Sequence, residues 1–545
     1  ELAVNVTDKR LYTENNAGAI VELGTNPSTI DINAGTVDGI TSLSTSTSGT
    51  SNFIAGVNAG NSITSGGNYN TVVGDEAGTA ITTGDYSTFV GYAAGDATTT
   101  GLDNTALGAL ALTSNTVGAY NVAIGQSALH NNVDGSNSVA IGRLALYAQD
   151  PASAADMHNV AVGYTAGAAV TTGRLNTLIG GSAGSATTTA NNVTAVGASA
   201  LSANTTGADI TAVGAATLAT NTTGASNTAV GYGALNANTT AGNNTGIGAY
   251  ALVANTTGTR MTSVGARSGM QNTTGNYNAF FGYDSGESNT TGASNTFIGD
   301  SAGRETTTAS NNTAVGQSAL LANTTGTRNT AVGALTLDTS TTGDQNTAVG
   351  YGAMDANTTG SNNVAIGDAA LASNTTASNN TAVGDDALKF NTTGASNVAV
   401  GSLAGDAMTT ANNNTALGHG SLGANTTGIE NIALGSGAGE RITTGADNVC
   451  IGYVSGAHAV HLATGVGNTI IGSYADVSAT DSDYANVIGF NVTGDAGYTT
   501  LGNGGADIRA AHGNITWAVI SDQRYKKDIV DSTAGLSFIN ALQPR

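Results

Sequence analysis

Residues 227–243 read Asn-Thr-Ala-Val-Gly-Tyr-Gly-Ala-Leu-Asn-Ala-Asn-Thr-Thr-Ala-Gly-Asn, and this 17-residue unit recurs along most of the chain. The glycine after the short apolar run, here called the marker glycine, recurs every 17 residues from Gly74 to Gly142 and from Gly163 to Gly452. With Gly472 and Gly489 these glycines define 25 coils. The unit is too short for a helix pair, a propeller blade or a leucine-rich repeat. It predicts an all-β fold, a parallel β-solenoid or β-roll with one repeat per coil.

We expect two short strands in each coil, one at Asn-Thr-Ala-Val and one around Ala-Leu. Turns at the marker glycine and at Asn-Thr-Thr-Gly would separate them, because Gly and Asn tolerate the left-handed conformation. Coils stacked about 4.8 Å apart give a rod of roughly 120 Å. Asn fills the first position in 19 of the 25 coils, so the stacked Asn side chains should form a hydrogen-bonded ladder.

Side-chain alternation along each strand separates the small residue from the large ones. In Val122-Ala123-Ile124 the two large residues share one face and Ala123 lies on the other. We expect Val and Ile to fill the interior and the alanines to form an outward column of small apolar residues. Such a stripe is better explained by a packed partner than by water, which favours a homotrimer around a threefold axis. The alternative is a monomeric solenoid that tolerates Ala on its surface. The outward column comprises Ala123, Ala229, Ala314, Ala365 and Ala399, with their counterparts in the other coils.

Composition limits the classes of partner. The 545 residues carry a net charge of −22, which disfavours nucleic acid and electrostatic attachment to anionic membranes. No run of 18 apolar residues is present, so we expect no membrane insertion. The single cysteine, Cys450, takes the place of a repeat alanine and is interpreted as a buried, inert thiol. No cofactor is expected, and because the chain begins at Glu1 rather than Met, a signal peptide or another upstream segment is expected to be missing.

The coils, written Asn-Ser/Thr-Val/Ala-Ala/Val-Ile/Val-Gly, resemble known fibre repeats. They look like the left-handed parallel β-roll heads of trimeric autotransporter adhesins of the YadA type, and like the Gly-rich repeats of bacteriophage tail fibres. The resemblance covers residues 53 to about 502, although the adhesin heads use shorter coils. It implies a trimer and a left-handed roll.

The C-terminal stretch Trp517-Ala-Val-Ile-Ser-Asp-Gln-Arg-Tyr-Lys-Lys-Asp-Ile529 carries a second resemblance. It is similar to the start of the intramolecular chaperone domain of phage endosialidases and tail fibres, through the pattern Ser-Asp-x-Arg-x-Lys followed by an apolar residue. The resemblance implies a domain that trimerises, guides folding and cuts itself off before Ser521, with Ser521 and Lys526 required. A hydroxyl nucleophile beside a lysine base makes the chemistry plausible, while a surface turn is the alternative. The motif residues are Ser521, Asp522, Arg524, Lys526 and Ile529.

The chain divides into a shaft segment at 1–52, the solenoid at 53–505, a connector at 506–520 and the incomplete chaperone-like start at 521–545. The shaft segment alternates apolar and polar residues around residues 15–18, which predicts a hairpin. Two insertions interrupt the repeat. Leu146–His158 contains Pro151 and should loop out, because Pro cannot donate to a central ladder. The insertion at His458–His461 is expected to be a similar loop, without a metal site.

The leading hypothesis is a structural and adhesive fibre that is not an enzyme, apart from self-cleavage. It would be a phage tail fibre or appendage, located on the virion or otherwise extracellular. Its partners would be other virion tail proteins and a host-surface receptor, either a glycan or an outer-membrane component. The alternatives are a bacterial cell-surface trimeric adhesin, an ice-binding solenoid and a polysaccharide-degrading tailspike. The ice binder is disfavoured because the Thr-Thr pairs fall at predicted turns. The tailspike would need a carboxylate pair such as Asp368 and Asp385, which follow marker glycines in adjacent coils.

Overall fold

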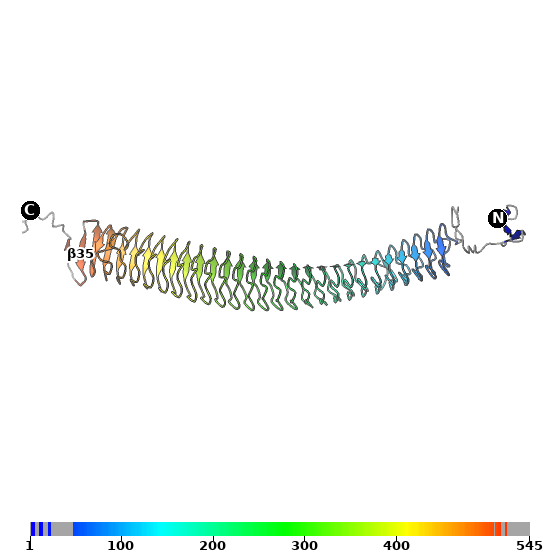
Figure 1. Ribbon diagram of the computed structural model, residues 1–545, viewed down its shortest axis with the longest axis horizontal. Coiled ribbons are helices and arrows are strands. Elements are labelled where there is room, and N and C mark those ends of the chain that lie inside the picture. Colours follow the sequence, from blue (N-terminus) through cyan, green and yellow to red (C-terminus); the bar gives the residue numbers. More distant parts are fainter. Residues whose placement is uncertain are drawn as a thin grey trace, which may run out of the picture.

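The computed structural model describes residues 2–5, 10–14, 20–22, 47–505, 507–513 and 518–519. Within these ranges the chain is all-β, and residues 53–503 form a parallel β-solenoid with the 17-residue repeat. Figure 1 shows the coils stacked into a long, gently curved rod. The strands of successive coils pair in parallel, as in Thr228↔Thr245. The predicted fold class is therefore confirmed, and there are 27 coils because one more stacks at each end, with marker glycines Gly56 and Gly502.

Each coil contributes a single short strand to the continuous sheet. The strands of this sheet are β4 (Phe53–Ala55), β5 (Thr71–Val73), β6 (Thr88–Val90), β7 (Thr105–Leu107), β8 (Val122–Ile124), β10 (Val139–Ile141), β12 (Val160–Val162), β13 (Thr177–Ile179), β14 (Val193–Val196), β15 (Ile210–Val213), β16 (Thr228–Val230), β17 (Thr245–Ile247), β18 (Thr262–Val264), β19 (Ala279–Phe281), β20 (Thr296–Ile298), β21 (Thr313–Val315), β22 (Thr330–Val332), β23 (Thr347–Val349), β24 (Val364–Ile366), β25 (Thr381–Val383), β26 (Val398–Val400), β27 (Thr415–Leu417), β28 (Ile432–Leu434), β29 (Val449–Ile451), β30 (Thr469–Ile471), β32 (Asn486–Phe490) and β34 (Tyr498–Asn503).

The second strand predicted around Ala-Leu does not form. This segment consists of turns, because alternate residues adopt left-handed backbone, with φ of 58° at Leu110 and 55° at Leu112. An extended strand needs strongly negative φ at every residue, so these angles exclude it. The turns still bond to the next coil through their backbone, as when Leu112 N–H donates to the carbonyl of Ala128 at 2.9 Å.

The interior is the reverse of the one predicted. Ala123 is fully buried, whereas Val122 and Ile124 are half-exposed, and this pattern repeats along the rod. The outward column of alanines is therefore wrong, and so is the core of Val and Ile. The physical reason is the narrow interior, in which the centre of each strand faces the turn segment. A Cβ added to Gly246 at the strand centre would lie 3.2 Å from Leu235 Cγ, so little more than Ala fits opposite Leu.

Large and small residues compensate one another between the strand centre and the position four residues after the marker glycine, which is leucine in many coils. Three coils have glycine at that second position and phenylalanine at the strand centre, namely Phe89, Phe280 and Phe297. A Cβ on Gly303 would lie 2.5 Å from the ring of Phe297, so the phenyl group fills the space that Leu fills elsewhere. Phe297 also stacks on Phe280 in the neighbouring coil, with ring centroids 5.3 Å apart. These cores are close-packed, with large and small residues compensating one another.

The predicted Asn ladder is confirmed, and a second one runs beside it. Asn227 Oδ1 accepts the backbone N–H of Asn244 at 3.0 Å, and its Nδ2 donates to the carbonyl of Ala241 at 2.9 Å. In the second column, Asn238 Nδ2 donates to Asn221 Oδ1 at 2.8 Å and to the same Ala241 carbonyl at 3.0 Å. Both columns are buried, so these bonds offset the cost of placing amides in the core.

The marker glycine is required by the stacking as well as by its backbone angle. From Gly56 to Gly489 these glycines have φ between 125° and 141°. A Cβ on Gly231 would lie 2.6 Å from the carbonyl group of Gly248 in the next coil. Any larger residue would therefore force adjacent coils apart.

The two ends of the described chain carry antiparallel pairs. The predicted hairpin around residues 15–18 is confirmed by β2 (Arg10–Glu14) and β3 (Ile20–Glu22), and β1 (Leu2–Asn5) pairs with the other side of β2. At the opposite end β35 (Ile508–Ala511) pairs antiparallel with β34, and β36 (Ala518–Val519) pairs with β35. The change of strand direction ends the parallel stack there.

The first insertion loops out only in part. Residues 152–154 are exposed, but Pro151 is buried. The chain rejoins the rod through β11 (Ala155–Asp156), which pairs with β9 (Gly135–Ser136). Near the second insertion β31 (Asp476–Val477) pairs with β33 (Thr493–Gly494).

Candidate functional site

The residues predicted for self-cleavage lie outside the described part of the chain. These are Ser521, Lys526, Asp522 and Arg524. Their role remains a prediction.

The outer face of the sheet forms one uncharged stripe along the rod. Each coil presents the residues three and one positions before its marker glycine outward, as Thr228 and Val230 do in β16, and both are half-exposed. Between β4 and β34 every residue in these two columns is Thr, Asn, Ala or a larger apolar residue. This face is not among the predicted features, because the large strand residues were expected in the interior. We call these two columns the outer sheet face.

The Thr-Thr pairs lie at turns, as predicted. Thr222 is half-buried, and its Oγ1 donates to the carbonyl of Thr239 in the next coil at 3.1 Å. Its neighbour Thr223 is exposed. The first Thr of each pair therefore joins adjacent coils.

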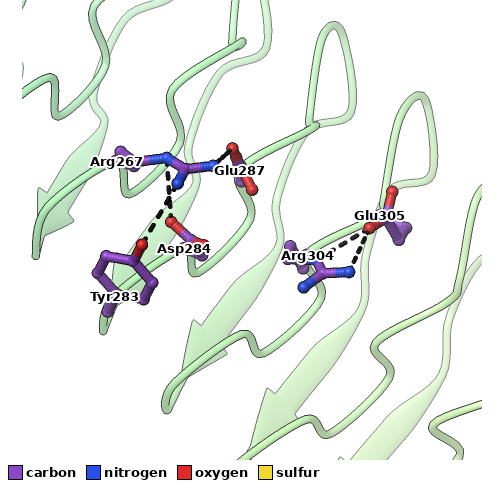
Figure 2. A network of polar contacts seen from close by, with 6 residues as sticks. All are labelled: Arg267, Tyr283, Asp284, Glu287, Arg304 and Glu305. Carbon is purple, nitrogen blue, oxygen red and sulfur yellow. Dashed lines mark hydrogen bonds and ion pairs between the residues drawn. The ribbon is translucent and has the colours of Figure 1, made fainter.

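A polar network joins two coils near the middle of the rod. Figure 2 shows Arg267 reaching Tyr283, Asp284 and Glu287 of the following coil. Arg267 Nε lies 3.3 Å from Asp284 Oδ1, and burial raises the pKa of the Asp284 carboxyl. In the next coil Arg304 pairs with Glu305 at 2.8 Å. Arg267 is shared by two carboxylates of the following coil and ties the two coils together, whereas Arg304 and Glu305 pair within one coil, so the charged groups of this network already have partners in the same chain.

A surface hollow of about 320 Å³ opens near the C-terminal end of the solenoid. It is lined by Leu403, Asp406, His419, Gly420, Gly423, Ala424, Glu440 and Arg441.

The hollow exists because glycine occupies a position where neighbouring coils have side chains. A Cβ on Gly423 would lie 3.4 Å from Asp406 Oδ1 and 3.8 Å from Glu440 Cγ, so both acidic side chains extend over this glycine. Burial raises the pKa of the Asp406 carboxyl. His419 and Arg441 complete the polar lining. The hollow therefore places two acidic groups, one guanidinium and one imidazole around a space without side chains.

Four aromatic side chains follow the hollow along the same corner of the rod; we call Tyr453, His458, Tyr474 and Phe490 the aromatic platform. Tyr474 contacts the other three rings, with centroid distances of 5.3 Å to Tyr453, 4.8 Å to His458 and 5.9 Å to Phe490. Tyr453 is 50% exposed and Phe490 is 55% exposed. His419 in the hollow and Tyr453 in the platform each directly follow a marker glycine, two coils apart.

The second insertion supplies His458 to this platform and is held by a buried carboxylate. Asp476 is only 1% exposed, and its Oδ2 accepts the backbone N–H groups of residues 459, 460 and 461 at 2.7, 3.1 and 3.2 Å. His458 itself is exposed, as predicted for a loop. Within the described ranges no group of three His, Cys, Asp or Glu residues is placed to hold a metal ion.

The remaining predicted positions have separate locations. Asp368 and Asp385 are exposed on the corner after their marker glycines. Cys450 is fully buried, as predicted, and burial raises the pKa of its thiol to about 12. In the described part of the chain no helix is long and apolar enough to cross a membrane.

Comparison with known proteins identifies no relative of this chain: no protein-family model, no curated protein and no solved structure matches it.

Proposed function

We propose that this protein is a structural and adhesive fibre, a phage tail fibre or appendage that attaches the virion to the host surface. The observation that carries the proposal is the unbroken register of 27 coils in one sheet. In a rod of this kind each coil contacts only its neighbours, so adding repeats lengthens the rod without requiring new long-range contacts. The coils resemble both phage fibre repeats and bacterial adhesin heads, so it is the resemblance of Ser521–Lys526 to the chaperone domain of phage fibres that favours the virion over a bacterial surface.

The fibre is a homotrimer in this proposal, and its contact surface is the outer sheet face rather than the buried alanines. At about 4.8 Å per coil, 27 coils make a stripe about 130 Å long. A stripe roughly 10 Å wide then offers on the order of 1,300 Å² per chain, more than the roughly 800 Å² per partner of a standard interface. The absence of charge in its two columns allows copies of this acidic chain to approach one another.

The chaperone-like segment would align the chains during assembly. Parallel pairing across long sequence separations folds slowly, and repetitive strands are prone to slip in register. A trimerising domain that leaves by cleavage between Ile520 and Ser521 would lock the assembled rod kinetically. Lys526 would take the proton of the Ser521 hydroxyl, whose oxygen would attack the Ile520 carbonyl carbon and displace the Ser521 amine, and water would then hydrolyse the resulting ester.

Immunogold electron microscopy with antibodies against residues 53–505 tests the location. Labelling of the tails of phage particles supports the tail fibre. Labelling of bacterial envelopes in cultures free of phage supports the alternative, a cell-surface adhesin. Labelling of neither structure contradicts both adhesive assignments.

A further inference from the structure

We infer that the corner of the rod from the hollow at Asp406 to the aromatic platform at Phe490 binds a neutral polysaccharide chain. The inference rests on the proposed adhesive function and names the ligand class and the site. It combines two independent features, a polar hollow and an exposed aromatic surface, which share one corner of neighbouring coils.

The hollow suits a hydroxyl-rich group. Asp406 and Glu440 offer carboxylate acceptors for hydroxyl hydrogens, and Arg441 offers guanidinium donors for hydroxyl oxygens. Leu403 supplies an apolar wall. With a volume of about 320 Å³, the hollow lies at the lower end of the range of small-molecule sites, about 300–1,000 Å³. This size fits a single sugar ring rather than a larger ligand.

The aromatic platform suits the apolar C–H face of further sugar rings. Tyr453 and Tyr474 pack edge to face, with an interplanar angle of 87°, so the ring faces are not used up by mutual stacking. Rigid aromatic side chains provide a large contact area at a low cost in conformational entropy. At half exposure, Tyr453 and Phe490 retain much of this area for a ligand.

The surface is held in place before any ligand binds. The three N–H bonds to Asp476 fix the insertion that carries His458, and His458 packs on Tyr474. A preorganised surface loses less entropy on binding. Between the two features Gly437 is buried, and the side chains of Glu440 and Val454 lie over it, because an added Cβ would be 3.3 Å from Glu440 Oε2 and 3.4 Å from Val454 Cγ2.

Charge selects a neutral polymer. Asp406 and Glu440 flank the hollow, Arg441 is the cation in its lining, and the chain as a whole carries −22. A polyanionic glycan would be repelled by this field. From Gly401 to Gly489 the corner spans five coil steps, about 24 Å at about 4.8 Å per step, which accommodates several sugar units.

Affinity electrophoresis of the full chain through gels containing dextran, galactomannan or alginate tests the inference. We expect retardation by at least one of the two neutral polymers and none by alginate. Tyr453→Ala should weaken retardation at least tenfold, because it removes a platform ring. Gly423→Leu should do the same by filling the hollow, since Leu321 occupies the equivalent place in another coil.

Matched variants at equivalent positions provide the controls. Tyr351 also follows a marker glycine and is 62% exposed, and Ala372 is equivalent to Gly423. Tyr351→Ala and Ala372→Leu should leave retardation unchanged. Thermal unfolding of each variant shows whether the rod remains folded.

Three results would overturn the inference: no retardation by either neutral polymer, retardation by alginate alone, or equal losses in Tyr453→Ala and Tyr351→Ala. Any of them would leave the fibre assignment standing if the antibodies still label phage tails. If the antibodies do not label phage tails but the neutral polymer is still bound and Tyr453→Ala still weakens this binding, the tail-fibre assignment is contradicted and the binding site stands.

Discussion

Exchange of volume between the strand centre and the facing turn predicts a strong coupling between Phe297 and Gly303. Phe297→Ala leaves a cavity and should cost about 3–5 kcal/mol. Gly303→Leu alone adds a side chain at a position where even its Cβ would lie 2.5 Å from the Phe297 ring. Overpacking costs about 1–3 kcal/mol, and left-handed backbone at a non-glycine residue costs about 1–2 kcal/mol more.

The double variant restores the pair found in the next coil, where Ala314 faces Leu320. The backbone accepts this change, because φ is 59° at Gly303 and 57° at Leu320. If the effects were additive, the double variant would lose roughly 5–10 kcal/mol, the sum of the single costs. Volume complementarity predicts a loss of only about 1–4 kcal/mol, from the backbone cost and an exchange that conserves volume.

Native-state hydrogen exchange of the amides in the coil around Gly299, with increasing denaturant, measures these local opening free energies. The double variant should be more protected than Gly303→Leu alone. A double variant as unstable as the sum of the single variants would refute the exchange of volume, since the two sites would then act independently.

Three further predictions test other parts of the structure. Ala229→Asp should destabilise its coil by several kcal/mol, because it buries an unpaired charge, whereas Val230→Asp on the half-exposed face should cost much less. Hydrogen exchange of the β16 amides measures both losses. A larger loss for Val230→Asp than for Ala229→Asp would show that the large residues fill the interior. Cys450, with a thiol pKa near 12, should resist a thiol-specific disulfide reagent at pH 8 in the folded rod and react on unfolding, and rapid labelling of the folded rod would contradict its burial. Burial, reinforced by the nearby charge of Asp355, raises the pKa of the Asp338 carboxyl, so the ionised carboxylate opposes folding. Asp338→Asn should therefore raise the unfolding temperature at pH 7, and this gain should vanish below the unfolded-state pKa of about 3.9. A gain that persists at pH 3 would assign the effect to packing instead.

The sequence was sufficient for the period, the parallel stacking and the Asn ladder. These follow from the spacing of the marker glycines and from Asn at a fixed position, as in Asn227 and Asn244, because identical residues in a stacked repeat must lie above one another. The hairpin near residues 15–18 was also predictable from local alternation and a turn sequence.

The orientation of each strand was not predictable from alternation alone. The parity of Val122, Ala123 and Ile124 was correct, but parity does not say which face is the interior. That choice depends on the opposite wall of the coil, where Leu129 occupies the space that a large strand residue would need. The prediction of a second strand was wrong for a related reason. Residues such as Leu129 adopt left-handed backbone, and a leucine in the sequence gives no indication of that conformation.

The hollow and the aromatic platform were beyond sequence analysis for a different reason. Gly423 and Tyr453 are ordinary variations at variable positions of the repeat, and they become a surface only when coils stack. The insertion at His458–His461 was visible as an interruption. Its attachment to Asp476, which lies 15 to 17 residues further along the chain, required the structure.

Cryo-electron microscopy of the purified fibre most directly tests the central claim that these coils stack in register with the outer sheet face as the assembly surface. We expect rods of three chains with a repeat of about 4.8 Å along the axis and one strand per coil. Thr313 and Val315 should lie at contacts between chains, while Ala314 lies inside its own coil. Rods in which Ala314 faces a neighbouring chain, or single chains whose outer sheet face remains bare, would contradict the account.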